Sequence, residues 1–164
     1  MKKQLWILLA LAMLLTGCTS EGQRLKEPVT FYYLMDSYQF GEEPKVFATD
    51  LREGAGHRHD LSYLLTLYLM GPSQEGLASP LPKQTRILSL SQTLHTIQIT
   101  LSDTSDILSD IDFTRACACL TMTCTQLTGI GTVTVESGSR SVTMTQDTML
   151  LFDDSLRAAQ EETQ

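Results

Sequence analysis

The sequence predicts an α+β fold, a two-layer sandwich in which two helices cover one face of a mostly antiparallel sheet. Two observations lead to this prediction. Along the chain, the segments follow the order strand, helix, hairpin, helix, hairpin. Each helical segment carries one apolar stripe and each strand one apolar face, so laying both helices on one side of a sheet buries all of these surfaces together.

The chain has the size and composition of one globular domain. It has 164 residues, of which 42% are hydrophobic and 19% are charged, a balance that is typical of chains that fold around a core. Its formal net charge is −7. Because a surface that binds nucleic acid needs a surplus of Lys and Arg, we expect no nucleic-acid partner.

The first 17 residues have the pattern of a secretory signal peptide. Lys2 and Lys3 form a short basic region, and the apolar run Leu5–Leu15 is too short to cross a bilayer as a helix. Small residues then precede Cys18. This arrangement resembles the lipobox of bacterial lipoproteins, in which the cysteine receives a diacylglyceryl group and the signal is cut before it. The alternative is an ordinary signal peptide followed by a chance cysteine.

We therefore expect residues 1–17 to be a lipoprotein signal peptide and Cys18 to be lipidated. The lipid would hold the chain on the outer leaflet of the cytoplasmic membrane, at its extracytoplasmic face. Residues 18–28 are polar and contain Gly and Pro, which predicts a lipid-anchored linker. The folded domain is predicted over residues 29–152, and residues 153–164 are predicted to form an acidic tail.

The first half of the domain predicts two strands and a helix. Val29–Met35 is rich in β-branched and aromatic residues, and Val46–Leu51 is a weaker strand candidate. Asp60 offers an N-cap, and Gly71-Pro72 ends the helix, because glycine supplies a left-handed residue and proline cannot continue a helix. The apolar stripe of this helix consists of Leu61, Leu64, Leu65 and Tyr68.

The second half predicts a hairpin, a longer helix and another hairpin. Residues 86–91 and 94–101 are strand candidates around the turn Gln92-Thr93. Residues 113–128 have threonines at every second position, as in a strand, but their apolar residues recur at helical spacing over a longer window. We therefore predict a helix that ends at Gly129. The final hairpin pairs residues 131–136 and 140–144 across Ser137-Gly138-Ser139.

Several motifs over residues 58–145 fit one known family. The first helix ends in the small-residue stop Gly71-Pro72-Ser73, and a segment of Gly, Leu, Ser and Pro follows at residues 76–82. The pair Leu101-Ser102 closes the first hairpin, and Gly129-Ile130 ends the second helix. In these features the chain resembles the GerM-type (GerMN) domain of sporulation and spore-germination proteins.

The resemblance implies a small α+β module with no catalytic residues and no cofactor. Such modules are similar to the ring-building modules of secretion-like complexes. They lie outside the cytoplasmic membrane of spore-forming bacteria, often on lipoproteins, and help to assemble envelope complexes during sporulation. The expected partners are therefore envelope or sporulation proteins, and self-association into a homo-oligomer stays open.

The irregular segment between the first helix and the first hairpin is the candidate partner surface. It is stiffened by proline and is expected to be exposed. The alternative is a rigid crossover between the two layers, and the sequence favours neither interpretation. The residues of this candidate surface are Gly71, Pro72, Ser73, Gly76, Leu77, Pro80, Leu81 and Pro82.

The histidines before the first helix do not predict a metal site. His57 and His59 flank Arg58, whose charge would repel a cation, and the carboxylate of Asp60 is expected to cap the helix. The sequence also lacks a recognisable group of nucleophile, base and acid, so we expect no enzyme activity.

Three cysteines fall on the second helix. Cys117 and Cys124 share a helix face but are about 10 Å apart along the axis, which is too far for a disulfide. We expect these two to fill the core as small apolar groups. Cys119 lies about 200° around the helix from Cys117 and is expected to be the more exposed thiol.

These expectations combine into one functional prediction. The chain is predicted to be a membrane-tethered lipoprotein that acts without catalysis, through protein–protein contact in envelope assembly, in connection with sporulation or germination. The alternative is a ligand-binding lipoprotein that recognises a peptidoglycan fragment or a small solute. An apolar pocket of several hundred Å³ near residues 71–82 would favour that alternative.

Overall fold

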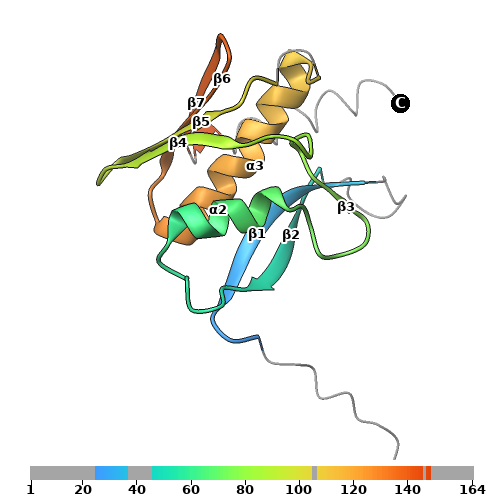
Figure 1. Ribbon diagram of the computed structural model, residues 1–164, viewed down its shortest axis with the longest axis vertical. Helices are drawn as coiled ribbons and strands as arrows, with labels where there is room; N and C mark the ends of the chain where they lie inside the picture. Colours follow the sequence, from blue (N-terminus) through green and yellow to red (C-terminus); the bar gives the residue numbers. More distant parts are fainter. Residues whose placement is uncertain (1–24, 37–45, 105–106, 146, 149–164) are drawn as a thin grey trace, which may run out of the picture.

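Two helices and seven strands make up the described part of the chain (Figure 1). The computed structural model describes residues 25–36, 46–104, 107–145 and 147–148. The strands are β1 (Pro28–Met35), β2 (Phe47–Glu53), β3 (Leu77–Ala78), β4 (Ile87–Gln92), β5 (Thr96–Leu101), β6 (Thr132–Ser137) and β7 (Arg140–Thr145). The helices are α2 (Leu61–Leu69) and α3 (Asp110–Thr128).

A three-stranded antiparallel sheet has the order β2-β1-β3, with β1 at its centre. Along β1, the side chains of Val29, Phe31 and Tyr33 are buried, and the residues between them are half-buried. This alternation follows from the two-residue period of a strand, which turns one face of β1 toward the core.

A second sheet has four strands in the order β4-β5-β6-β7. The pairs β4–β5 and β6–β7 are antiparallel hairpins, whereas β5 and β6 are parallel. A parallel pair needs a long crossover connection, and α3 is the element that connects β5 to β6. The core face of this sheet includes Ile97, Ile99, Val133 and Val135, all fully buried.

Helix α2 packs on the three-stranded sheet as its apolar stripe predicts. The Asp60 carboxylate accepts a hydrogen bond from the backbone N–H of Tyr63 at 3.0 Å, which confirms the expected N-cap. The ring of Tyr68 stacks on that of Tyr33, with 4.8 Å between the ring centroids. Gly71 follows the helix with a φ of 90°, a left-handed conformation that favours glycine.

Helix α3 lies between the two sheets (Figure 1). It contacts β1 on one side and β6 and β7 on the other. The Tyr32 backbone N–H on β1 donates to Thr123 Oγ1 of α3 at 3.0 Å, so the helix satisfies a strand N–H. Ser109 caps the first turn, and Gly129 ends the helix in the expected left-handed conformation with a φ of 76°.

The α+β class, the two helices and the predominance of antiparallel strands are confirmed. The structure adds that the strands divide into two sheets, which the order of elements did not reveal. The first hairpin also turns later than expected, because β4 extends to Gln92 and β5 begins at Thr96. Helix α3 begins at Asp110 rather than at Phe113, since Ser109 supplies its N-cap.

The expectation that Cys119 is an exposed thiol is wrong. Its side chain is fully buried, as are those of Cys117 and Cys124. The expectation assumed that α3 buries a single stripe. Because sheets lie on two sides of this helix, residues that face away from one sheet face the other.

Several expectations fall outside the described residues. These are the signal peptide over residues 1–17, the lipidated Cys18 and the tail over residues 153–164. Of the linker, only residues 25–28 are described. Within the described ranges, no helix is long and apolar enough to cross a membrane.

Candidate functional site

The candidate partner surface is partly interior. Ser73 and Gly76 are exposed, whereas Pro80 and Leu81 are buried against the core and cannot present their side chains to a partner. The other four residues of the surface, Gly71, Pro72, Leu77 and Pro82, are half-buried. The tip that remains accessible therefore consists of residues 73–76, which are all exposed.

A buried carboxylate holds the start of this tip in place. Asp50 on β2 has no exposed surface, and its two carboxylate oxygens accept hydrogen bonds from Ser73. The Ser73 N–H donates at 2.8 Å and the Ser73 hydroxyl at 2.7 Å. Both bonds are charge-assisted, and both involve one buried carboxylate, so they fix the backbone where it leaves α2.

A second group of polar contacts fastens the end of α2. The Arg52 guanidinium donates to the backbone carbonyls of Leu67 and Gly71 at 3.2 and 3.0 Å. The Tyr33 hydroxyl donates to the carbonyl of Tyr68 at 2.8 Å. Burial raises the pKa of that hydroxyl well above its usual range, so it remains a donor at any physiological pH.

The far end of the tip is also fixed. The Gly76 carbonyl accepts a hydrogen bond from the Asp36 N–H at 2.9 Å, and β3 then pairs with the end of β1. Segment 71–82 is therefore a rigid crossover that presents a short exposed tip. The contacts at both ends fit the interpretation as a crossover, and the role of the exposed tip as a partner surface stays a prediction.

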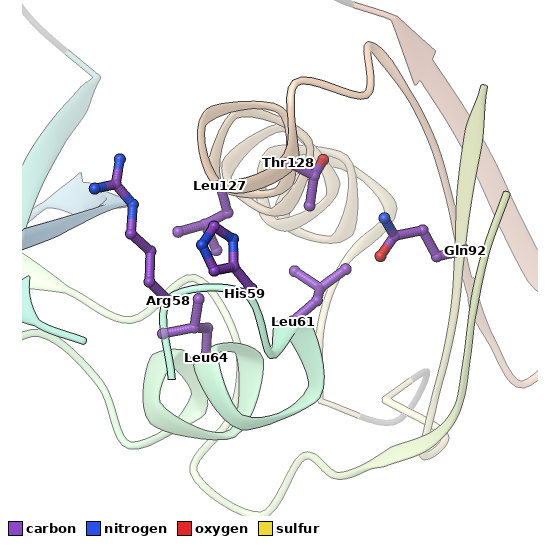
Figure 2. Close-up of a pocket in the computed structure, with 7 residues that line it drawn as sticks. All are labelled: Arg58, His59, Leu61, Leu64, Gln92, Leu127 and Thr128. Carbon is purple, nitrogen blue, oxygen red and sulfur yellow. The ribbon is translucent and has the colours of Figure 1, made fainter. Parts of the chain in front are cut away.

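A small cavity among the described residues lies elsewhere, between α2 and α3. This α2–α3 cleft has a volume of about 170 Å³ (Figure 2). Three leucines are among its lining residues, Leu61 and Leu64 of α2 and Leu127 of α3, and the two on α2 are buried. The other lining residues are polar: Arg58, His59, Gln92 and Thr128. The cleft is smaller than the pockets of 300 to 1,000 Å³ that hold drug-sized ligands. None of its residues belongs to segment 71–82, so it does not meet the expectation for a small-solute site.

The three described thiols are poor nucleophiles. Burial raises the pKa of Cys117 and of Cys124 to about 12, and it raises that of Cys119 still further. A thiol must lose its proton to attack an electrophile or bind a metal, so all three are inactive near neutral pH.

The loop before α2 uses its histidine in an aromatic contact. The ring of His57 stacks on that of Tyr63, with 4.0 Å between the centroids, and His57 Nδ1 lies 3.9 Å from a carboxylate oxygen of Asp60. Within the described residues, no three His, Cys, Asp or Glu side chains are grouped closely enough to hold a metal ion.

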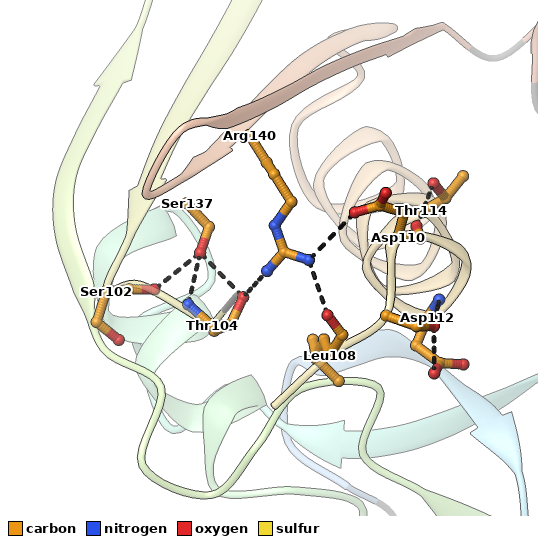
Figure 3. A network of polar contacts seen from close by, with 9 residues as sticks. Ser102, Thr104, Leu108, Asp110, Asp112, Thr114, Ser137 and Arg140 are labelled. Atoms are coloured by element: carbon orange, nitrogen blue, oxygen red, sulfur yellow. Dashed lines mark hydrogen bonds and ion pairs between the residues drawn. The ribbon is translucent and has the colours of Figure 1, made fainter. Parts of the chain in front are cut away.

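One polar network was not expected from the sequence. It centres on Arg140 at the start of β7 (Figure 3). The Arg140 guanidinium donates to the Leu108 carbonyl at 2.9 Å and to Thr104 Oγ1 at 2.7 Å, and it lies over the Phe113 ring at 4.2 Å. The buried Ser137 hydroxyl accepts a hydrogen bond from the Thr104 N–H at 3.0 Å. The network joins the last hairpin to the chain that leads into α3.

The turn beside this network has a glycine next to the Asp103 side chain. A Cβ at Gly138 would lie 2.6 Å from a carboxylate oxygen of Asp103, and the φ of Gly138 is 59°. A larger residue would therefore have to displace the Asp103 carboxylate, and the positive φ favours glycine at this position. The only sequence signal for the network was an Arg in a hairpin strand at a core-facing position, and that signal is weak because long side chains usually reach solvent.

A comparison with known protein families shows which family this chain belongs to. The family model described as "Germane: Sporulation and spore germination" matches residues 30–143, which is more than two thirds of the chain. The chain belongs to the Germane family. The match confirms the resemblance to the GerM-type domain and connects the chain with sporulation and germination. No curated protein sequence matches this Germane chain significantly.

Two solved structures are similar to the Germane chain in fold. One is a 2.5 Å crystal structure of a Clostridium perfringens protein provisionally described as a lipoprotein. The identity is 22% and the TM-score 0.45, with 73% of this chain and 89% of that chain covered. The other contains the tandem GerMN domains of the sporulation protein GerM from Bacillus subtilis, with 17% identity and a TM-score of 0.47. That alignment covers 69% of this chain and 39% of the tandem-domain chain.

Proposed function

We propose that this Germane-family chain is a membrane-tethered lipoprotein that acts without catalysis. In this proposal it works by protein–protein contact in an envelope complex of sporulation or germination. The observation that carries the proposal is the family match over residues 30–143, which takes in nearly all of the described fold. The lipobox-like sequence before Cys18 supports the tether.

The chemistry of the interior supports a role without catalysis. The groups with strongly raised pKa values are the three thiols of α3 and two tyrosines, and all of them are buried and kept in their neutral forms. Such groups stabilise a core rather than transfer protons at neutral pH.

The tip of segment 71–82 supports a contact role. Residues 73–76 are exposed, yet hydrogen bonds to Asp50 and Asp36 fix both ends. A surface loop that is already ordered loses little conformational entropy when a partner binds, so this tip is suited to recognition.

The tether is tested with the variant Cys18→Ala in the native host. We expect the protein to leave the membrane fraction, because no lipid would then be attached. Thr19→Ala, which leaves the cysteine intact, serves as the matched control and should stay membrane-bound. If Cys18→Ala fractionates with membranes as the parent chain does, the lipoprotein assignment is wrong.

The contact role is tested at the tip with Gln74→Ala combined with Glu75→Lys, two exposed positions. We expect the anchored protein to lose its co-purifying envelope partners and the host to form or germinate spores less efficiently. Thr143→Lys, on an exposed strand position far along the sequence, is the control. Unchanged spore formation and germination after complete deletion of the chain would overturn the proposed function.

A further inference from the structure

The outward face of α2 carries no charge. The helix contains no Asp, Glu, Lys or Arg, although Ser62, Tyr63 and Thr66 are exposed on it. Met70, which caps its C-terminal end, is 76% exposed, and Tyr63 is 37% exposed. A surface helix normally has charged residues on the side away from the core, so the composition of α2 is that of a helix with a covered outer face.

Tyr63 and Met70 form one stripe along this face. They are seven residues apart, which is two turns or about 10 Å along a helix, so they point in nearly the same direction. Between them lie the exposed Thr66 and the half-buried Leu67. The buried residues of α2 fall on the opposite side of the helix. The stripe is therefore symmetric about the point between Thr66 and Leu67.

The stripe is already rigid in the single chain. The Asp60 carboxylate caps the start of α2, and Arg52 donates to the carbonyls of Leu67 and Gly71 at its end. The ring of His57 stacks on that of Tyr63, with 4.0 Å between the centroids, which restricts the tyrosine side chain. A surface that is ordered before binding loses little conformational entropy in a contact.

The chain has opposite charges on the two sides of α2. Arg58 in the loop before the helix and Glu75 in the tip after it are both exposed. The carboxylate of Asp60, closer to the helix, already accepts the Tyr63 N–H and lies 3.9 Å from His57. If a second copy of α2 lies antiparallel on the first, Arg58 of each copy is at the end that carries Glu75 of the other. The two helix dipoles then also have opposite directions, which is favourable.

We propose that α2 pairs with α2 of a second copy, as an antiparallel helix pair with two-fold symmetry about the point between Thr66 and Leu67. Tyr63 of each copy packs on Met70 of the other, a favourable contact between an aromatic ring and a thioether. A second copy fits because inverting the same segment matches the stripe and both charges at once. The uncharged face also lets two chains of net charge −7 meet without repulsion at the contact.

The pair is expected to form on the membrane. The nine residues of α2 span about 14 Å, so the contact is smaller than the interfaces that are stable between free proteins. Anchored copies share one surface, which raises their effective concentration. The inference therefore rests on the tether in the proposed function.

Cysteine cross-linking of the full chain in membranes of the native host tests the pairing. Thr66→Cys should form a disulfide dimer on mild oxidation, because two helices about 8–10 Å apart bring the two copies of position 66 within about 7 Å. Ser62→Cys, also exposed on α2, is the matched control, since its two copies would be more than about 13 Å apart. The three α3 thiols are fully buried, and the parent chain measures the background.

A mixed experiment tests the direction of the pair. Tyr63→Cys and Met70→Cys, expressed together, should cross-link to each other, whereas each variant alone should not, because its two copies lie about 10 Å apart along the axis. A dimer of Tyr63→Cys alone indicates parallel helices and overturns the proposal. Thr66→Cys dimers no more abundant than those of Ser62→Cys overturn self-pairing through α2.

Charge reversal tests the ends of the pair. In the Thr66→Cys chain, Arg58→Glu or Glu75→Arg should lower the dimer yield about fivefold, since each change affects two exposed ion pairs. Both changes together should restore the yield, and Arg86→Glu, at an exposed arginine away from α2, should not alter it. Failure of the double change to restore the yield overturns the proposed alignment. A chain that stays membrane-bound without cross-linking at position 66 refutes the pairing alone and leaves the proposed function standing.

Discussion

Arg52 and Arg140 lie on different sheets, and each fastens a helix end. Arg52 donates to the carbonyls of Leu67 and Gly71, at the C-terminal end of α2. Arg140 donates to the carbonyl of Leu108, just before the N-terminal end of α3. Each guanidinium also lies near a phenylalanine ring, at 5.9 Å in the first case and 4.2 Å in the second.

The difference between the two arginines is electrostatic. The C-terminal end of a helix carries partial negative charge, which attracts the Arg52 guanidinium. Any cationic side chain at position 52 would gain from the same attraction. The N-terminal end carries partial positive charge, which is unfavourable for Arg140. Arg140 therefore depends on directional contacts with Leu108, Thr104 and the ring of Phe113. The same side chain serves as a point charge in one region and as a rigid, planar donor in the other.

The largest effect is expected from replacing these arginines. Arg140→Ala should lower the free energy of unfolding by about 3 kcal/mol, because it leaves Leu108 O and Thr104 Oγ1 without their donor. Arg140→Lys should recover little of this loss. Arg52→Ala should cost about 1 kcal/mol, and Arg52→Lys should recover most of it. Urea denaturation of all four variants gives these values.

The proposed difference between Arg52 and Arg140 is wrong if lysine restores the free energy of unfolding equally at both positions. In that case charge alone would explain both contacts, and the planar geometry of Arg140 would be unimportant. Circular dichroism in the absence of urea verifies that each variant keeps its helices.

A smaller effect is expected from the carboxylates of the two regions. Asp50 is fully buried and accepts two hydrogen bonds from Ser73, so Asp50→Ala should lower the free energy of unfolding by about 2 kcal/mol. The Asp110 side chain is 96% exposed and lies 3.8 Å from Arg140. Exposed ion pairs contribute little, so Asp110→Asn should not change the urea midpoint measurably. A large shift for Asp110→Asn would show that the ion pair, rather than the hydrogen bonds, holds Arg140.

The smallest effect is expected from two stacked tyrosines. The Tyr33 hydroxyl donates to the Tyr68 carbonyl, whereas the buried Tyr68 hydroxyl has no hydrogen-bond partner within the described residues. Tyr33→Phe should therefore cost about 1 kcal/mol in the free energy of unfolding, and Tyr68→Phe should be neutral or slightly stabilising. Thermal denaturation distinguishes the two, since only Tyr33→Phe should lower the Tm. A clear loss of stability in Tyr68→Phe would reveal a polar partner for its hydroxyl.

The local elements could be predicted because their signals lie within a few residues. The Asp60 cap, the apolar stripe of α2 and its stop at Gly71 are all short-range features, and the structure confirms each of them. The same holds for Gly129 at the end of α3 and for the last hairpin. Capping and turn preferences depend on backbone conformation, which neighbouring residues largely decide.

The arrangement of the sheets could not be predicted in the same way. The periodic pattern of a strand shows that one face is buried, but it does not show which strand lies beside it. The parallel pairing of β5 with β6 joins residues separated by a whole helix. That pairing places α3 between two sheets, which buries Cys119 against the expectation from a single stripe.

The α2–α3 cleft could not be predicted from the sequence either. Its residues come from the loop before α2, from α2 itself, from the end of β4 and from the end of α3, so no contiguous motif encodes it. Segment 71–82, by contrast, is contiguous and proline-rich, and the sequence singled it out. Only the structure separates its exposed tip from the buried Pro80 and Leu81.

The sequence by itself determined the fold class, the C-terminal ends of both helices, the final hairpin and the family resemblance, because each depends on short-range patterns. The tertiary structure decided the two-sheet arrangement, the burial of all three α3 thiols, the roles of Arg52 and Arg140, and the cleft. These features depend on contacts between residues far apart in the chain. Such contacts form only when elements pack, and their partners are set by shape and burial rather than by spacing along the sequence.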